Sequence, residues 1–136
     1  MVVEVACGVI LRGDKVLCVQ RSEYMSLPLK WEFPGGKVEQ NEAPDQCLIR
    51  ELDEELNIQV EIFEKLSNSY FDYGNLEIIL IPYLCKYLGD EIILSEHKEF
   101  LWLPYTELEF LDWAPADIPI VGEIIKLKED NGRRII

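Results

Sequence analysis

Three glutamates stand within a five-residue stretch near the middle of the chain, at a spacing that places them on one side of a helix. Glu51, Glu54 and Glu55 fall within about one 100° sector of a helix that turns 100° per residue. Like charges three and four residues apart destabilise a helix by a few tenths of a kcal/mol per pair, unless a cation lies among them. Because the donors are all carboxylate oxygens, the cation that suits them is Mg²⁺ or Mn²⁺.

An acidic run also has an ordinary explanation as a solvated helix face, which is the commoner case in a chain with 26 acidic and 13 basic side chains. The surroundings favour a site instead. Gly36 ends a glycine-containing segment before the helix, Glu42 lies near the helix start, and Arg50 directly precedes the first glutamate. Arg50 can pair with Glu54 at i, i+4 or brace another carboxylate through both arms of its guanidinium. We therefore predict that Arg50 orients carboxylates around a divalent cation.

The helix that carries these carboxylates is predicted over Pro44 to Leu56. Pro44 suits a first helical position, Asp45 adds a negative charge near the helix N-terminus, and apolar residues recur at helical spacing. Before this helix, the segment from Trp31 to Gly36 contains a proline and two glycines and is predicted to be a loop.

The other elements are expected to form one mixed sheet. Two apolar runs, Val2 to Leu11 and Val16 to Val19, flank a turn and predict a hairpin. A second amphipathic helix is predicted over Ile118 to Lys128. Further strands are predicted over Gln59 to Leu66, Glu77 to Tyr87 and Phe100 to Pro104. The sequence thus predicts an α/β fold with helices packed on a mixed sheet, in one domain over residues 1–136.

Composition narrows the possible partners. The chain has 136 residues, 49% of them apolar, and a formal charge of −13, which would repel a polymeric nucleic acid. A small phosphate ligand is compatible with this charge if a cation locally reverses its sign. No apolar run is long enough to cross a bilayer, and no signal peptide stands at the start, so we expect a cytoplasmic protein without a membrane partner. The four cysteines lack CxxC spacing and are predicted to be buried reduced thiols.

The acidic helix and the glycine before it resemble the Nudix box, G-x5-E-x7-R-E-U-x-E-E-x-G-U, where U is a bulky aliphatic residue. One position departs from this pattern, because Asn57 stands where the box has glycine. Asparagine is the next most tolerant residue in a left-handed helix end, so the helix is expected to end there as usual. The matching positions are Gly36, Glu42, Arg50, Glu51, Leu52, Glu54, Glu55 and Ile58.

The likeness extends beyond the box to Trp31–Glu39 and to Trp113–Pro119, which are similar to the MutT branch of the Nudix family. That branch includes oxidised-guanine triphosphatases and CTP pyrophosphohydrolases. The resemblance implies an α/β/α sandwich with a mixed sheet. It also implies hydrolysis of a nucleoside triphosphate to the monophosphate and pyrophosphate with Mg²⁺, for which Mn²⁺ is a possible substitute.

The resemblance also implies a set of metal ligands. Glu96 enters this set from a loop, because it precedes Trp102 by six residues, as a metal-binding or base glutamate does in the MutT branch. Glu99 lies nearby and is the alternative counterpart. The full implied set is the carbonyl of Gly35 with the carboxylates of Glu51, Glu54, Glu55 and Glu96. Catalytic roles fall to Glu51, Glu54 and Glu96, with Arg50 as the residue that orients them.

Substrate contacts are implied at four positions. Lys37 would contact a phosphate, although it can equally be a solvent-facing lysine. Arg21, Phe33 and Asp117 would contact the base, with Phe33 and Trp113 as candidate walls. Asp117 stands where oxidised-guanine enzymes carry asparagine or, in some relatives, aspartate, and its alternative role is N-cap of the final helix.

Three functions follow as hypotheses. The first is hydrolysis of 8-oxo-dGTP or dGTP-type nucleotides for nucleotide-pool sanitation, the second is hydrolysis of CTP or dCTP, and the third is a catalytically silent nucleotide sensor. The intact acidic trio favours an enzyme over a sensor. His97 has no spaced Cys or His partner, so we interpret it as a surface or structural residue. The partner is expected to be a small nucleoside triphosphate, and the protein a monomer or homodimer.

Overall fold

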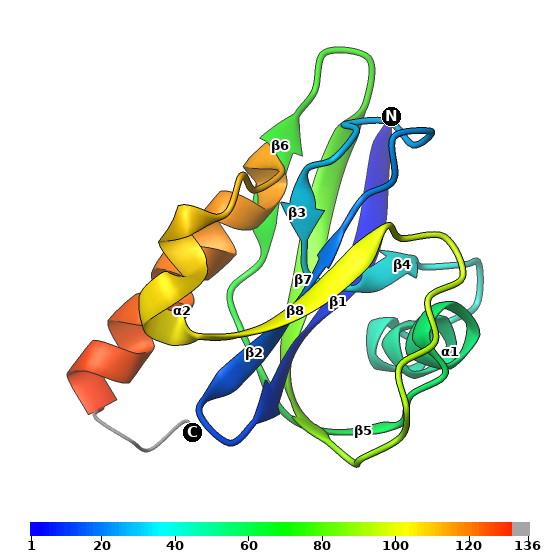
Figure 1. The fold of residues 1–136 in the computed structure, drawn as a ribbon. Helices are drawn as coiled ribbons and strands as arrows, with labels where there is room; N and C mark the ends of the chain where they lie inside the picture. The colour runs from blue at the N-terminus through cyan, green and yellow to red at the C-terminus, as the bar shows by residue number, and fades with distance from the viewer. Residues whose placement is uncertain (132–136) are drawn as a thin grey trace.

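The predicted N-terminal hairpin forms the centre of the sheet. In the computed structural model, which describes residues 1–131, strands β1 (Val2–Arg12) and β2 (Lys15–Gln20) pair antiparallel with Arg12 opposite Lys15 (Figure 1). Gly13 takes a φ of 60° in the turn between them, a conformation that costs glycine little. This hairpin is confirmed, with each strand one or two residues longer than predicted.

The rest of the sheet is mixed, as predicted. Strand β7 (Glu77–Tyr87) pairs in parallel with β1. β5 (Val60–Lys65) and β6 (Ser69–Asp72) pair antiparallel with β7. β8 (Glu99–Pro104) pairs antiparallel with β2. No strand was predicted over Ser69–Asp72.

The prediction of a loop from Trp31 to Gly36 was wrong in part, because two short strands lie there. β3 (Trp31–Glu32) pairs with β2, and β4 (Gly35–Lys37) pairs with β1. A Cβ at Gly35 would lie 1.9 Å from the backbone oxygen of Ala6. The glycine thus lets the backbones of β1 and β4 approach where a side chain would keep them apart. Glycine, which was interpreted as a sign of a loop, here permits strand pairing.

Both predicted helices are present. α1 (Pro44–Leu56) has the predicted bounds and ends at Asn57 in the left-handed conformation, with φ 61° and ψ 35°, as expected for the residue in place of the glycine. α2 (Ile118–Asn131) runs three residues beyond the predicted end. Two 3₁₀ helices, Tyr105–Phe110 and Pro115–Asp117, precede it.

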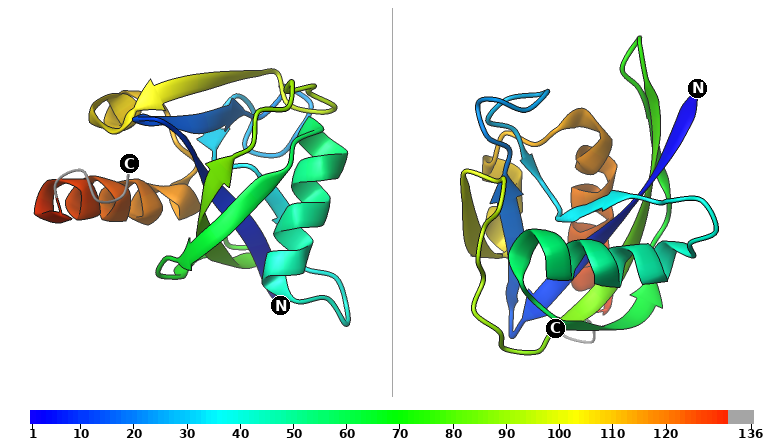
Figure 2. Two further views of the ribbon diagram at one scale, coloured as in Figure 1. Left: turned by 90° about the horizontal axis from the view of Figure 1, so that it is seen from below. Right: turned by 90° about the vertical axis from the view of Figure 1, so that its right-hand side faces the viewer.

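The two helices cover opposite faces of the sheet, which gives an α/β/α arrangement (Figure 2). The faces follow the alternation of β1: Ala6 and Ile10 pack in the cluster with α1, whereas Cys7 and Val9 pack in the cluster with α2. All four cysteines are buried and free, as predicted. Neither helix within residues 1–131 has the length and apolar character to cross a membrane.

Candidate active site

Arg50 is the centre of the acidic face of α1. Its Nε lies 2.6 Å from Oε2 of Glu42, and its Nη1 lies 3.0 Å from both Oε2 of Glu51 and Oε1 of Glu54. Its Nη2 donates to the carbonyl of Lys37 at 3.4 Å. One guanidinium thus fixes three carboxylates and the end of β4, which is the orienting geometry predicted for this residue.

Glu42 closes the connection between β4 and α1. Its Oε1 accepts the backbone N–H of Glu39 at 3.0 Å. Hydrogen bonds from Arg50 and from this N–H lower the pKa of Glu42 to about 2, so the carboxylate stays charged and keeps the loop attached to the helix. Glu42 is thus held by a backbone N–H and by a side-chain hydrogen bond.

Glu51 lies against the backbone of β4. A Cβ placed on Gly36 would meet its Cδ at 2.2 Å, so the carboxylate occupies the space that a side chain at position 36 would need. Partial burial, which outweighs the opposing effect of Arg50, raises the pKa of Glu51, and the charges of Glu55 and Glu54 raise it further.

Glu55 meets a second carboxylate from outside the helix. Ser95 Oγ donates to Oε2 of Glu55 at 2.8 Å, and the Ser95 N–H donates to the Glu55 backbone carbonyl at 3.2 Å. This places the adjacent Glu96 beside Glu55, whose charge and hydrogen bond raise the pKa of Glu96. Glu99, the alternative counterpart, is the first residue of β8 and is paired with Gln20.

The residues expected to contact the substrate lie at the ends of strands β2, β3 and β4 and before α2. The Phe33 ring is 3% exposed and stacks on Trp113 with centroids 4.6 Å apart. The ring is thus part of the core and does not form an open wall, although its backbone N–H faces Asp117. Arg21 pairs with Glu32 at 2.9 Å, and its Nε donates to the Ser26 carbonyl at 2.6 Å. Lys37 is exposed at the end of β4.

Asp117 has a partner far away in the chain. Its Oδ1 accepts the Phe33 N–H at 3.0 Å, so the carboxyl reaches across to the β3–β4 connection and does not cap the final helix as the alternative had it. Asp117 is 5% exposed. Burial raises its pKa well above the ordinary value, and the nearby charge of Glu32 adds to this effect.

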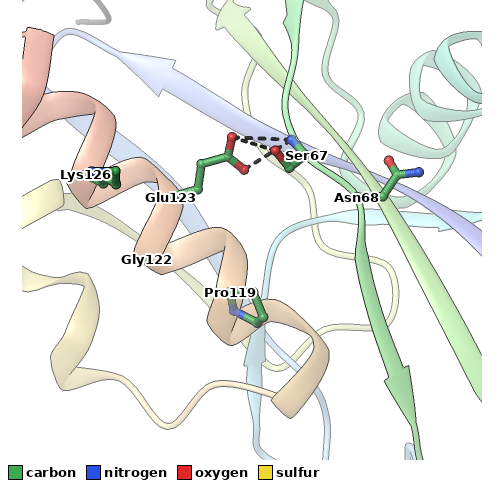
Figure 3. Close-up of a pocket in the computed structure, with 6 residues that line it drawn as sticks. All are labelled: Ser67, Asn68, Pro119, Gly122, Glu123 and Lys126. Atoms are coloured by element: carbon green, nitrogen blue, oxygen red, sulfur yellow. Dashed lines mark hydrogen bonds between the residues drawn. The ribbon is translucent and has the colours of Figure 1, made fainter.

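A separate pocket lies away from these residues. It has a volume of about 370 Å³ and is formed by the β5–β6 connection and α2 (Figure 3). Glu123 accepts the N–H and the hydroxyl of Ser67 there, each at 3.1 Å. Since none of the predicted site residues lines it, this pocket is not part of the candidate active site.

Comparison with known proteins decides the family. A model of the NUDIX domain matches residues 2–123. The chain belongs to the Nudix family. A CTP pyrophosphohydrolase of Escherichia coli is 32% identical to this Nudix protein, with 93% of each chain covered. A putative 8-oxo-dGTP diphosphatase 2 of Mycobacterium tuberculosis is 35% identical, with 90% of this chain and 87% of the relative covered.

Solved structures agree with the family assignment. The E. coli ORF135 protein superimposes with a TM-score of 0.83 at 30% identity, over 96% of this chain and 94% of that one. A MutT protein of methicillin-resistant Staphylococcus aureus 252, described as a Nudix hydrolase, is 44% identical with a TM-score of 0.76, over 93% and 97% of the two chains. The Nudix protein is thus a hydrolase of pyrophosphate bonds with the MutT-like fold.

Nudix hydrolases generally use divalent metal ions, and the carboxylates of this one suit such an ion chemically. Within residues 1–131, no three His, Cys, Asp or Glu side chains already form a group that could hold a metal. Glu51 and Glu54 are turned toward Arg50, while Glu55 and Glu96 repel each other. A hard divalent cation among these oxygens would relieve that repulsion. The donor set fits the ion, because Arg50 contacts only one oxygen each of Glu51 and Glu54.

One residue near the site, Glu32, was not predicted from the sequence, and it contacts His97, whose interpretation as a structural residue agrees with its burial. Glu32 bridges Arg21 and His97, with each contact at 2.9 Å. His97 is structural, since its side chain is 6% exposed. Glu32 stands between two aromatic residues. Because side chains alternate along a strand, Glu32 points away from the core that holds Trp31 and Phe33, and this pattern could have identified it as a residue near the site. Because the segment from Trp31 to Gly36 was predicted to be a loop, the alternation of a strand was not applied to it.

Proposed function

We propose that this Nudix hydrolase is a Mg²⁺-dependent nucleoside triphosphate pyrophosphohydrolase that acts on 8-oxo-dGTP or dGTP-type nucleotides and releases the monophosphate and pyrophosphate. One observation carries the proposal: Arg50 holds Glu51 and Glu54 beside the glycines of β4, with Glu55 and Glu96 next to them. The relative named as an 8-oxo-dGTP diphosphatase supports the choice of substrate.

One group of residues is proposed to act at the triphosphate end of the nucleotide. The cation would be held by the Gly35 carbonyl and by Glu51, Glu54, Glu55 and Glu96. When bound, it supplies the charge neutralisation that a triphosphate needs next to so many carboxylates. Arg50 keeps Glu51 and Glu54 in place, and a carboxylate of the set accepts the proton of the attacking water. Lys37, exposed at the end of β4, contacts a phosphate.

Asp117 is proposed to contact the base, together with Arg21 and the backbone of Phe33. An ionised carboxylate only accepts hydrogen bonds, whereas a neutral carboxyl also donates one. Because burial raises its pKa, Asp117 is held toward the neutral form and offers the same donor and acceptor pair as an amide. Such a pair can serve a guanine-type edge, which presents N–H donors and a carbonyl, and it can also serve the amino group and ring nitrogen of cytosine.

Hydrolysis of CTP or dCTP is the second candidate, favoured by the 32% identical CTP pyrophosphohydrolase. Pyrophosphate release from 8-oxo-dGTP, dGTP, CTP and dCTP, each with and without Mg²⁺, separates the candidates. We expect release only with the cation and the largest kcat/KM for 8-oxo-dGTP. The largest value for CTP or dCTP would replace the first candidate by the second. Binding of a nucleotide without turnover of any would identify a sensor.

A further inference from the structure

Glu32 joins two segments that are far apart in the sequence. Its Oε1 lies 2.9 Å from Nη1 of Arg21, at the end of β2, and its Oε2 lies 2.9 Å from Nε2 of His97, just before β8. All three side chains are at least four-fifths buried. β2 lies between β3 and β8 in the sheet, with Val19 paired both to Glu32 and to Phe100. Through Arg21 and His97, Glu32 on β3 therefore contacts the end of β2 and the segment just before β8.

The orientation of His97 depends on Glu32. Facing a carboxylate, Nε2 must carry a proton and donate, whereas Nδ1 is buried and has no hydrogen-bond partner among the described residues. The contact with Glu32 is therefore the hydrogen bond that fixes the imidazole. His97 directly follows Glu96, and Ser95 is attached to Glu55, so the anchor at His97 limits where Glu96 can lie.

The position of Arg21 determines the loop of residues 22–30. Its Nε donates to the carbonyl of Ser26 at 2.6 Å, and its Nη2 donates to the Ser26 hydroxyl at 2.9 Å. Within this loop Leu27 and Leu29 have φ values of 49° and 65°, a left-handed conformation that is unfavourable for leucine. Such a conformation persists only where surrounding contacts impose it. The Arg21 side chain, oriented by Glu32, supplies the contacts at Ser26, and backbone hydrogen bonds from Leu29 to the Arg21 carbonyl and from Lys30 to the Leu27 carbonyl supply others.

We propose that Glu32 is a positioning residue that couples the nucleotide side of the site to the cation side. Through Arg21 it fixes the loop of residues 22–30, and through His97 it fixes the segment that places Glu96 beside Glu55. This inference rests on the proposed function for the roles of the two sides. It adds a residue that touches neither the substrate nor the cation.

Glu32→Gln tests the coupling, because Arg21 and His97 contact different oxygens of Glu32, and an amide has an acceptor at only one of these two positions. Mn²⁺ binding to the free protein, followed by electron paramagnetic resonance, reports the cation side. The KM for the best triphosphate reports the nucleotide side. We expect Glu32→Gln to raise the Mn²⁺ Kd and the KM roughly tenfold each, the lower end for loss of an outer contact to a metal site.

Two further variants separate the halves. His97→Gln should raise the Mn²⁺ Kd and leave the KM within about twofold of the wild type, whereas Arg21→Ala should do the reverse. When Glu32→Gln is combined with His97→Gln, the Mn²⁺ Kd should rise by less than about twofold more, and when it is combined with Arg21→Ala, the same should hold for the KM, as expected for residues that act through one contact. These two single variants keep the proposal testable if Glu32→Gln does not fold.

Asp112→Asn is the matched control, since it removes the 2.8 Å ion pair between Asp112 and Lys30 next to the same loop and should change neither property. Equal effects of Asp112→Asn and Glu32→Gln would overturn the proposal, as would additive double variants or a Glu32→Gln effect on one side only. A wild type that binds Mn²⁺ but hydrolyses no triphosphate would refute the proposed function alone. The Mn²⁺ measurements and the Kd for the nucleotide would still test Glu32.

Discussion

The two sides of the candidate site hold their carboxylates in opposite ways. On α1, Glu42, Glu51 and Glu54 gather around one arginine at a half-open surface. At the other side, Asp117 is buried and accepts a backbone N–H from a residue 84 positions away. The first arrangement stabilises the charge of Glu42, whose pKa is lowered, whereas burial in the second disfavours the charge of Asp117 and raises its pKa. This difference fits the proposed function, in which the first side would hold a cation and the second would form hydrogen bonds with a neutral group.

Removing a carboxylate from the open side should have the largest effect on activity. Glu54 is 56% exposed and pairs with Arg50 at i, i+4, an arrangement that contributes little to stability. We expect Glu54→Gln to lower kcat by about 10²–10⁴-fold, the range for a group that acts on the reacting atoms. The free energy of unfolding, measured with urea, should change by less than about 0.5 kcal/mol. A loss of cooperative unfolding with kcat retained would place Glu54 in a structural role.

Alanine substitutions at the two adjacent glycines of β4 should have different effects, one on activity and the other on stability. In Gly36→Ala the new Cβ would meet the Glu51 carboxyl group, which can move. We expect kcat/KM to fall about 10²-fold, the effect of misplacing a group by about 1 Å, with little loss of stability. In Gly35→Ala the Cβ would meet the Ala6 backbone oxygen, which cannot move freely, so stability should fall by about 1–3 kcal/mol or more. Equal stability losses in urea unfolding would contradict this division.

The open side was predictable because its contacts are local. Arg50 reaches Glu42 and Glu54 over eight and four residues, so helical periodicity and one loop determine the cluster. The bounds of α1 and the left-handed Asn57 followed from the same local rules. By contrast, Asp117 meets Phe33 over 84 residues and His97 meets Glu32 over 65. Such contacts depend on strand order, which no short segment specifies, so Glu32 was missed and the Phe33 ring was placed at the site when it belongs to the core.

Asp117→Asn tests whether the buried side contacts a neutral edge of the base. An asparagine keeps the acceptor for the Phe33 N–H, but its amide donates through two N–H groups where a neutral carboxyl donates through one O–H. We expect the total rate to change only a few-fold, while the ratio of kcat/KM between 8-oxo-dGTP and dCTP shifts by about tenfold, the effect of one hydrogen-bonded group. Equal losses on every triphosphate in the panel would argue against a contact with the base.

The same variant should alter stability in a pH-dependent way. A carboxyl with a raised pKa contributes stability that is complete below its unfolded pKa and is lost as the pH rises through the folded pKa. Burial raises the pKa of Asp117, so Asp117→Asn should be more stable than the wild type at pH 8 by about 1–3 kcal/mol. The difference should shrink toward pH 4 in urea unfolding. A constant difference across this range would show that Asp117 does not titrate with folding.

Glu42 should show the opposite sign, with the smallest effect of the set. Its pKa is lowered from 4.5 to about 2, chiefly by its hydrogen bond from Arg50. A depressed pKa gives stability that is present above the unfolded pKa and is lost as the pH falls toward the folded one. Between pH 4.5 and pH 2, Glu42→Gln should therefore lose less stability than the wild type.

Glu39→Gln is the control for this measurement, because Glu39 lies 3.9 Å from Arg50 and is 68% exposed. Its urea unfolding midpoints should follow those of the wild type across the same acid range. If Glu42→Gln and Glu39→Gln gave the same pH profile, the Arg50 cluster would hold its carboxylates no more firmly than an exposed ion pair does. The two sides of the site would then differ only in the burial of Asp117, because the Arg50 cluster would not measurably stabilise the charge of Glu42.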